Sequence, residues 1–201
     1  MENLPYLFCD SVVATIENLR PLQHSIYAFR SKRGTWKTVL QDHATNRRTY
    51  RLFTGFNGGH WYYRLFNMEH SRTVNIQQIR NVKPKHLRVG YISFSRYSWE
   101  SPSTFSEISE MLKYLSPLLN SATLELCSCE TKDEDLAKLL CYLKKASIED
   151  INLCEKRESY KEFIRCQLKS VSFREFCGYN HLPEELQIEV REKLRLKQSL
   201  N

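Results

Sequence analysis

The chain of 201 residues has no long hydrophobic run and few glycine, proline, methionine or tryptophan residues. No apolar stretch approaches the roughly 20 residues that a bilayer-spanning helix needs, so no membrane partner is predicted. The composition also excludes collagen-like, low-complexity and disordered classes. The N-terminus lacks a basic flank before a long apolar stretch, which argues against a signal peptide. We therefore expect an intracellular protein of the cytoplasm or nucleus.

Recognisable catalytic motifs are missing as well. The sequence contains neither the G-x-x-x-x-G-K nor the G-x-G-x-x-G pattern of phosphate-binding loops. Its six histidines lie in no nucleophile or metalloprotease motif. These absences predict no enzyme, no catalytic residues and no cofactor. A cysteine–histidine pair that meets only in space stays open as the enzymatic alternative.

The cysteines lack the spacing of a metal site. Seven cysteines in a chain of this size are typical of reduced intracellular thiols. Cys127 and Cys129 form a C-x-C pair, and Cys141 and Cys154 are available as further ligands, but no C-x-x-C occurs. Residues i and i+2 of a strand point to the same face. Core packing is therefore the favoured interpretation, and no metal site is predicted.

Acidic residues are scarce in the first half of the chain. Residues 1–100 hold 15 Lys and Arg but only 6 Asp and Glu, whereas residues 101–201 hold 15 and 17. The formal net charge of +7 therefore comes from the first half. Such a surface suits an acidic protein partner or a nucleic acid.

Helices are predicted in the first 45 residues. Leu4-Pro5 is a typical helix start, because proline fits the first helical position. Apolar residues then recur at helical spacing, and Arg20-Pro21 ends the helix near residue 19. Shorter helical segments are expected near residues 22–29 and 36–43.

A β-hairpin is predicted over residues 50–66. Aromatic and apolar residues on both sides favour strands, and Asn57-Gly58-Gly59 supplies the positive φ angles of a tight turn. Residues 73–79 are expected to add a strand. Residues 81–86, which include Pro84, are expected to form a linker.

Beyond residue 88 a strand–helix unit recurs. Strands are predicted at residues 89–94, 123–127, 149–153 and 171–173, with amphipathic helices between them. Capping-box patterns begin at Thr104, Thr131 and Ser159, at intervals of 27 and 28 residues. A further helix is expected from Pro183. Alternating strands and helices predict an α/β fold (α+β overall) with parallel strands and helices over one face, a leucine-rich-repeat-like stack.

The N-terminal segment resembles the first helix of an F-box. That motif opens with Leu-Pro and places apolar residues at the offsets seen here in Leu4, Pro5, Phe8, Val12, Val13 and Ile16. Leu7 replaces the acidic residue that is usual two places after the proline. The second half normally ends in a valine followed closely by a tryptophan, and here the basic residues 31–34 precede Trp36. Residues 5–13 also resemble the start of nematode F-box-like families.

The resemblance implies a non-enzymatic adaptor of a cullin ubiquitin ligase. Its first helix is expected to dock on the cullin-ligase linker protein, and the repeats or the basic hairpin are expected to recruit an unknown target protein. The docking contacts implied are Phe8, Val12, Val13 and Ile16, with Leu4 and Pro5 setting the helix start. The alternative is that this helix packs on the core of its own domain, as amphipathic helices usually do.

Three parts of the chain are predicted on this basis. They are an F-box-like helical segment at 1–45, a hairpin and linker region at 46–87, and a strand–helix repeat domain at 88–201. A second function is a nucleic-acid-binding module, because basic groups neutralise phosphates and aromatic rings stack on bases. Its candidate residues are Arg47, Arg48, Arg51, Trp61 and Arg64. Strand alternation favours the simpler interpretation, with arginines facing solvent and aromatics facing the core.

Overall fold

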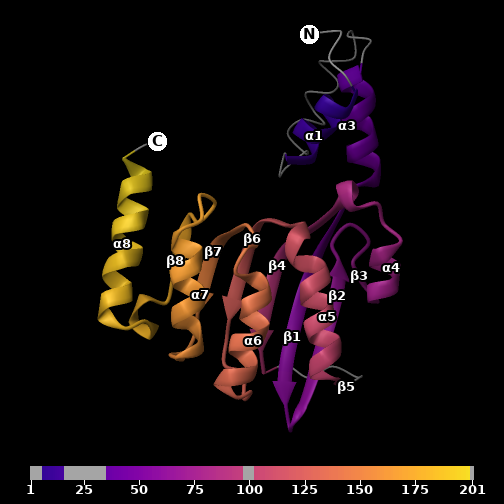
Figure 1. The fold of residues 1–201 in the computed structure, drawn as a ribbon. Coiled ribbons are helices and arrows are strands. Elements are labelled where there is room, and N and C mark those ends of the chain that lie inside the picture. The colour runs from indigo at the N-terminus through magenta and orange to yellow at the C-terminus, as the bar shows by residue number, and fades with distance from the viewer. Residues whose placement is uncertain (1–5, 16–34, 97–101, 200–201) are drawn as a thin grey trace.

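The computed structural model describes residues 6–15, 35–96 and 102–199 (Figure 1). Its helices are α1 (Tyr6–Thr15), α3 (Thr35–Asn46), α4 (Ile76–Arg80), α5 (Phe105–Leu115), α6 (Asp133–Leu143), α7 (Ser159–Leu168) and α8 (Glu184–Gln198). Its strands are β1 (Arg48–Asn57), β2 (His60–Asn67), β3 (Arg72–Val74), β4 (Leu87–Ser95), β5 (Pro102–Ser103), β6 (Leu119–Leu126), β7 (Ile148–Leu153) and β8 (Glu175–Cys177). Short 3-10 turns include η2 (Pro84–His86) and η4 (Tyr179–His181).

The strands form one mixed sheet in the order β3-β2-β1-β4-β6-β7-β8, with β5 paired to β2. Strands β1 and β2 form the predicted antiparallel hairpin, whose turn residues Gly58 and Gly59 both have positive φ. Strands β1, β4, β6, β7 and β8 run parallel. The predicted α/β class with parallel strands is confirmed. Because β4 pairs with β1, the sheet crosses the predicted boundary between residues 87 and 88.

Helices α5, α6 and α7 lie side by side over one face of the sheet (Figure 1). Each presents an apolar stripe at helical spacing, and in α6 this stripe is fully buried as Leu136, Leu139, Leu140 and Leu143. The main core lies between these helices and the apolar side of the strands. Helix α8 packs beyond α7 and buries Leu186 and Val190. None of the described helices is long and apolar enough to cross a bilayer.

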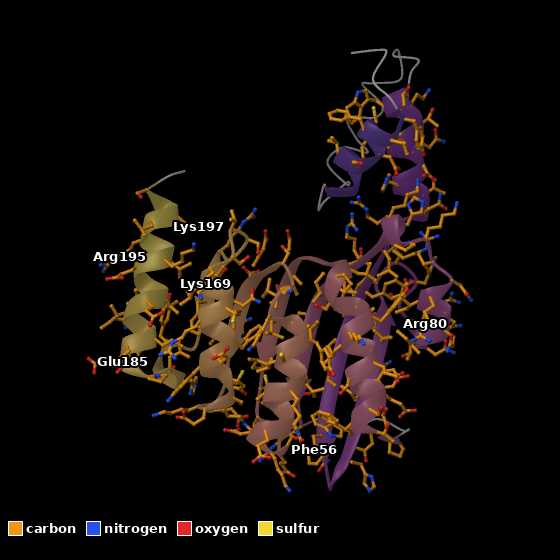
Figure 2. The ribbon with its side chains drawn as sticks, viewed as in Figure 1. Phe56, Arg80, Lys169, Glu185, Arg195 and Lys197 are labelled. Carbon is orange, nitrogen blue, oxygen red and sulfur yellow. The ribbon has the colours of Figure 1, made fainter. Side chains whose placement is uncertain are left out.

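The hairpin is fixed to the first repeat helix by aromatic contacts. Phe56, near the hairpin end of the sheet (Figure 2), lies 5.0 Å from Trp61 between ring centroids. Trp61 in turn lies 5.9 Å from Phe105 at the start of α5. Arg80 of α4 stands 5.5 Å from the ring centroid of Tyr114, which ties α4 to the same helix. The hairpin and the repeats therefore share one core.

Two strand predictions are wrong in position. The last strand was expected at 171–173 but lies at Glu175–Cys177, because hydrogen bonds among Ser170 and Ser172 turn the chain after α7. The strand expected at 73–79 ends at Val74. Asn75 then accepts a hydrogen bond from the Gln78 amide, and the Gln78 side chain accepts one from the Asn75 amide, which starts α4 instead.

Only one of the three predicted capping boxes forms. Thr104 and Glu107 exchange both hydrogen bonds at the start of α5. Helix α6 begins one residue later than expected, after Lys132, and the Thr131 carbonyl accepts a hydrogen bond from Arg157. Glu158 already has helical dihedral angles before α7, so Ser159 lies inside the helix and cannot cap it.

Candidate functional site

Helices α1 and α3 form a pair with its own small core. Cys9 and Val13 lie one turn apart on α1 and are fully buried with Val39 of α3. Trp36 and Leu40 cover the rim of this cluster. The pair stands beyond the end of the sheet (Figure 1) rather than over its face. The core of the pair is thus distinct from the core between the sheet and the repeat helices.

The predicted docking residues divide between the two sides of α1. The Phe8 side chain is 51% exposed and touches Trp36 edge-on with 6.4 Å between centroids, whereas Val12 is half-buried. Val13 is fully buried and belongs to the core of the pair, so it cannot serve as a docking contact in this arrangement. Leu4, Pro5 and Ile16 lie outside the described residues.

Two exposed apolar side chains on α1 were not among the predicted contacts. Leu7 is 76% exposed, and Tyr6 is 39% exposed although its ring centroid lies 5.6 Å from the Lys85 ammonium. In the sequence Leu7 stood out only as a departure from the F-box pattern. Its apolar character at a position where the motif carries an acidic residue was the available signal. We call Tyr6, Leu7 and Phe8 the α1 apolar patch.

A charged cluster joins the helical pair to the sheet. The Lys85 ammonium, on η2 just before β4, donates to Asp10 Oδ1 of α1 and to Asp42 Oδ2 of α3, both at 3.0 Å. Two buried histidines complete this junction: the His43 Nε2 lies 3.0 Å from Asp10, and the His86 ring lies 5.0 Å from His43. The junction thus draws on three segments that are far apart in sequence.

The charges and the burial at this junction shift the pKa values of its side chains. The Lys85 hydrogen bond lowers the pKa of Asp42, and the pKa of Asp10 is lowered because the hydrogen bonds from Lys85 and His43 outweigh the opposing effect of burial. The same two carboxylates raise the pKa of Lys85. Burial lowers the pKa of both His43 and His86, which therefore favour the neutral form.

Two of the predicted nucleic-acid-binding residues, Arg47 and Trp61, are buried and stabilise the fold instead. Arg47 is buried and donates to the carbonyl oxygen of Val13 at 2.7 Å, which ties α1 to the start of β1. Burial, with a contribution from the nearby Arg88 charge, lowers the pKa of Arg47 to about 10. Trp61 is 5% exposed and packs in the core. Neither can contact a phosphate or a base from its buried position, which corrects that part of the prediction.

The other predicted basic residues remain accessible. Arg51 and Arg64 are exposed on β1 and β2, on the side of the sheet opposite to α5, α6 and α7. We call this side the open sheet face. Arg48 is half-buried and donates to the Thr45 and Arg47 carbonyls at the C-terminal end of α3. It therefore fixes the connection between helix and strand.

One half of the open sheet face is aromatic and basic. The strand register places Arg51 between Phe66 of β2 and Tyr91 of β4, and Phe53 beside Arg64. The guanidinium carbon of Arg51 lies 5.6 Å from the Tyr91 ring centroid, and Phe53 lies 5.5 Å from the same ring. Arginine and aromatic side chains arranged in this way are typical of recognition surfaces.

The other half of the open sheet face is acidic and carries thiols. Register places Thr123 beside Asp150 and Glu125 beside Asn152. The Thr123 hydroxyl donates to Asp150 at 3.2 Å. Among the described residues, one group of potential metal ligands brings its atoms close together: Glu125, Cys127 and Cys154. The predicted C-x-C partner Cys129 lies apart from this group and is buried.

Comparison with known proteins identifies no relative. No protein-family model matches the chain, no curated protein shows significant similarity to it, and no solved structure matches its fold significantly.

Proposed function

We propose that this chain is an intracellular protein–protein interaction adaptor without catalytic residues of its own. In this proposal the helical pair α1–α3 docks on the linker protein of a cullin ubiquitin ligase, and the open sheet face recruits the target protein. The observation that carries the proposal is the α1 apolar patch. Contiguous exposed apolar side chains are typical of interaction sites, whereas isolated ones are ordinary.

The architecture of the helical pair supports docking. Cys9 and Val13 supply the core of the pair, so the opposite side of α1 presents Leu7 and Phe8 outward without loss of internal packing. One short helix therefore has a buried side that packs on α3 and an exposed side that a partner can reach. The F-box resemblance covers the same segment of the chain.

The open sheet face supports target recognition. It combines the exposed arginines of β1 and β2 with the half-buried rings of Phe53, Phe66 and Tyr91. Aromatic and arginine side chains contribute most of the energy at many protein interfaces. The adjoining carboxylates add charge of the opposite sign, which favours one partner orientation over another.

Binding of the purified full chain to purified cullin-ligase linker protein tests the proposal. We expect Phe8→Asp, at an exposed apolar position that the F-box motif shares, to weaken binding at least 30-fold, the effect of losing about 2 kcal/mol at a central apolar contact. Leu196→Asp is the matched control, because Leu196 is 64% exposed on α8, far from the patch. It should leave affinity unchanged.

Circular dichroism establishes that both variants fold. An intact chain that does not bind the linker protein, or a folded Phe8→Asp variant that binds as well as the unmodified chain, overturns the docking proposal.

A second candidate function is binding of single-stranded nucleic acid on the aromatic half of the open sheet face. The specific observation is that Arg51 and Arg64 lie 5.6 and 5.7 Å from the ring centroids of Tyr91 and Phe66. Bases stack on such platforms. Affinity for single-stranded RNA should then fall steeply with salt and drop in Arg51→Gln, but not in Lys138→Gln on α6. An affinity for single-stranded RNA that does not change with salt concentration excludes this function.

A further inference from the structure

Three ligand atoms converge on one point of the open sheet face. Glu125 and Cys127 are two residues apart at the end of β6 and therefore share a face. Cys154 directly follows β7, which pairs in parallel with β6. The Cys127 Sγ lies 3.0 Å from Glu125 Oε1 and 3.0 Å from Cys154 Sγ, and all three ligand atoms lie within 4.8 Å of one another.

A neighbouring hydroxyl orients the carboxylate of this group. The Tyr91 hydroxyl, from β4, hydrogen-bonds to Glu125 Oε2, which leaves Oε1 directed at the thiols. Phe53 and Arg51 in turn pack on the Tyr91 ring. An outer-shell partner of this kind holds a ligating group in place and is a regular feature of metal sites.

We propose that Glu125, Cys127 and Cys154 form a binding site for one thiophilic divalent metal ion, with Zn²⁺ as the fitting ion. Two thiolates and one carboxylate supply three of the four ligands of a tetrahedral zinc ion, and water takes the fourth position. Sulfur ligands exclude Mg²⁺ and Ca²⁺, which take oxygen ligands. Cys154 is exposed, so an ion can enter from solvent.

The spacing needs only a small adjustment. Metal–sulfur bonds of about 2.3 Å in a tetrahedral site hold two sulfurs roughly 3.8 Å apart. The two Sγ atoms lie 3.0 Å apart, so they must separate by less than about 1 Å. Rotation of the exposed Cys154 side chain supplies this movement without a shift of the strands.

In this arrangement, thiol protons form the hydrogen bonds that hold the three side chains together. The Cys127 thiol donates to Glu125 and shares a second hydrogen bond with Cys154. The ion must therefore release thiol protons to solvent as it binds. Its affinity should consequently rise with pH.

Titration of the reduced full chain with Co²⁺ under anaerobic conditions tests the site. We expect one ion per chain, seen as thiolate-to-cobalt charge-transfer absorption, which Zn²⁺ abolishes by displacement. Cys154→Ser should remove this absorption. Glu125→Gln should weaken Co²⁺ binding by more than about tenfold, since loss of an outer-shell partner already costs that much in metal sites and Glu125 is a direct ligand. Cys141→Ser, at an exposed cysteine of α6, is the matched control and should bind as the unmodified chain does.

The outcomes separate the proposal from its competitors. Absence of thiolate-to-cobalt absorption in the reduced chain overturns it, and so does absorption that survives Cys154→Ser or depends on Cys141. A Cys127–Cys154 disulfide formed with glutathione disulfide, in a chain whose reduced form binds no Co²⁺, also overturns it and shows a redox pair instead. Because Cys154 is exposed, its serine variant should keep the circular dichroism spectrum of the unmodified chain, and this measurement accompanies each titration.

Discussion

Replacement of Lys85 by methionine should loosen the helical pair from the sheet without unfolding the sheet. Methionine keeps most of the apolar stem but removes the ammonium that bridges Asp10 and Asp42. The two carboxylates are then left facing each other without a cation between them. The substitution therefore acts on the junction and not on the main core.

The magnitude follows from the exposure of the three side chains. Lys85, Asp10 and Asp42 are 31%, 16% and 28% exposed, so each ion pair is more buried than a surface pair and less than an interior one. Exposed pairs contribute up to about 1 kcal/mol, and hydrogen bonds to charged groups about 1.5–3 kcal/mol. About 1 kcal/mol for each pair gives a loss of about 2 kcal/mol, which raises the opening equilibrium of the pair roughly 30-fold.

Native-state hydrogen exchange measures this effect residue by residue. In Lys85→Met, amides of α1 and α3 should exchange roughly 30-fold faster, while amides of β4 and β6 keep their protection. Lys138→Met is the matched control, because Lys138 is 63% exposed in its 3.5 Å pair with Asp135. Equal acceleration in the helical pair and the sheet, or none in either, would refute this account of the junction.

Two further predictions test the energetics of the fold. Because burial lowers the pKa of His43 and His86 below the ordinary 6.5, the unfolded chain binds more protons, and the free energy of unfolding should fall as pH drops from 7 to 5. The junction carboxylates titrate below this range and do not contribute to the fall. The double variant with glutamine at both His43 and His86 should therefore lose less unfolding free energy between pH 7 and 5 than the control His70→Gln. Equal losses in the two variants, measured by urea unfolding at each pH, would contradict this. Gly178→Ala should lower the free energy of unfolding by more than Gly58→Ala, which loses only the roughly 1–2 kcal/mol of a left-handed backbone. The added Cβ at Gly178 would overlap the last carbonyl of β7, whereas Gly58 has open space, and urea titration compares the two.

The repeat region was the most predictable part of the fold. Its helices carry apolar residues at i, i+3, i+4 and i+7, and burial of the α6 leucines follows from that period. The hairpin was equally predictable, because Gly58 and Gly59 adopt the positive φ angles of a tight turn. Local capping was not: Thr131 fits the pattern but is displaced from the cap, since the Thr131 carbonyl and Asp133 both bind Arg157 from the next repeat.

The site could be predicted only in part, because strand register is not a local property. Cys127 and Cys154 lie 27 residues apart, and no linear spacing rule joins them. Their contact depends on the alignment of Leu126 with Leu153 across parallel strands. Burial of Arg47 and Trp61 likewise arises from elements distant in the sequence, because Arg47 bonds the Val13 carbonyl of α1 and Trp61 packs on Phe105 of α5. Sequence patterns predicted a basic and aromatic surface. Which of its residues are exposed depends on the tertiary structure.

The junction also determines what an adaptor built on this fold could do. Under the proposed function, α1 contacts the ligase and the open sheet face holds the target, so transfer of ubiquitin depends on a fixed orientation between them. That orientation rests on Lys85, which joins Asp10 and Asp42 across 75 and 43 residues of sequence. Lys85→Met should therefore reduce ubiquitin transfer to a bound target more than it weakens binding of the linker protein, because Lys85 meets the α1 apolar patch only at Tyr6, whose ring centroid lies 5.6 Å from the ammonium.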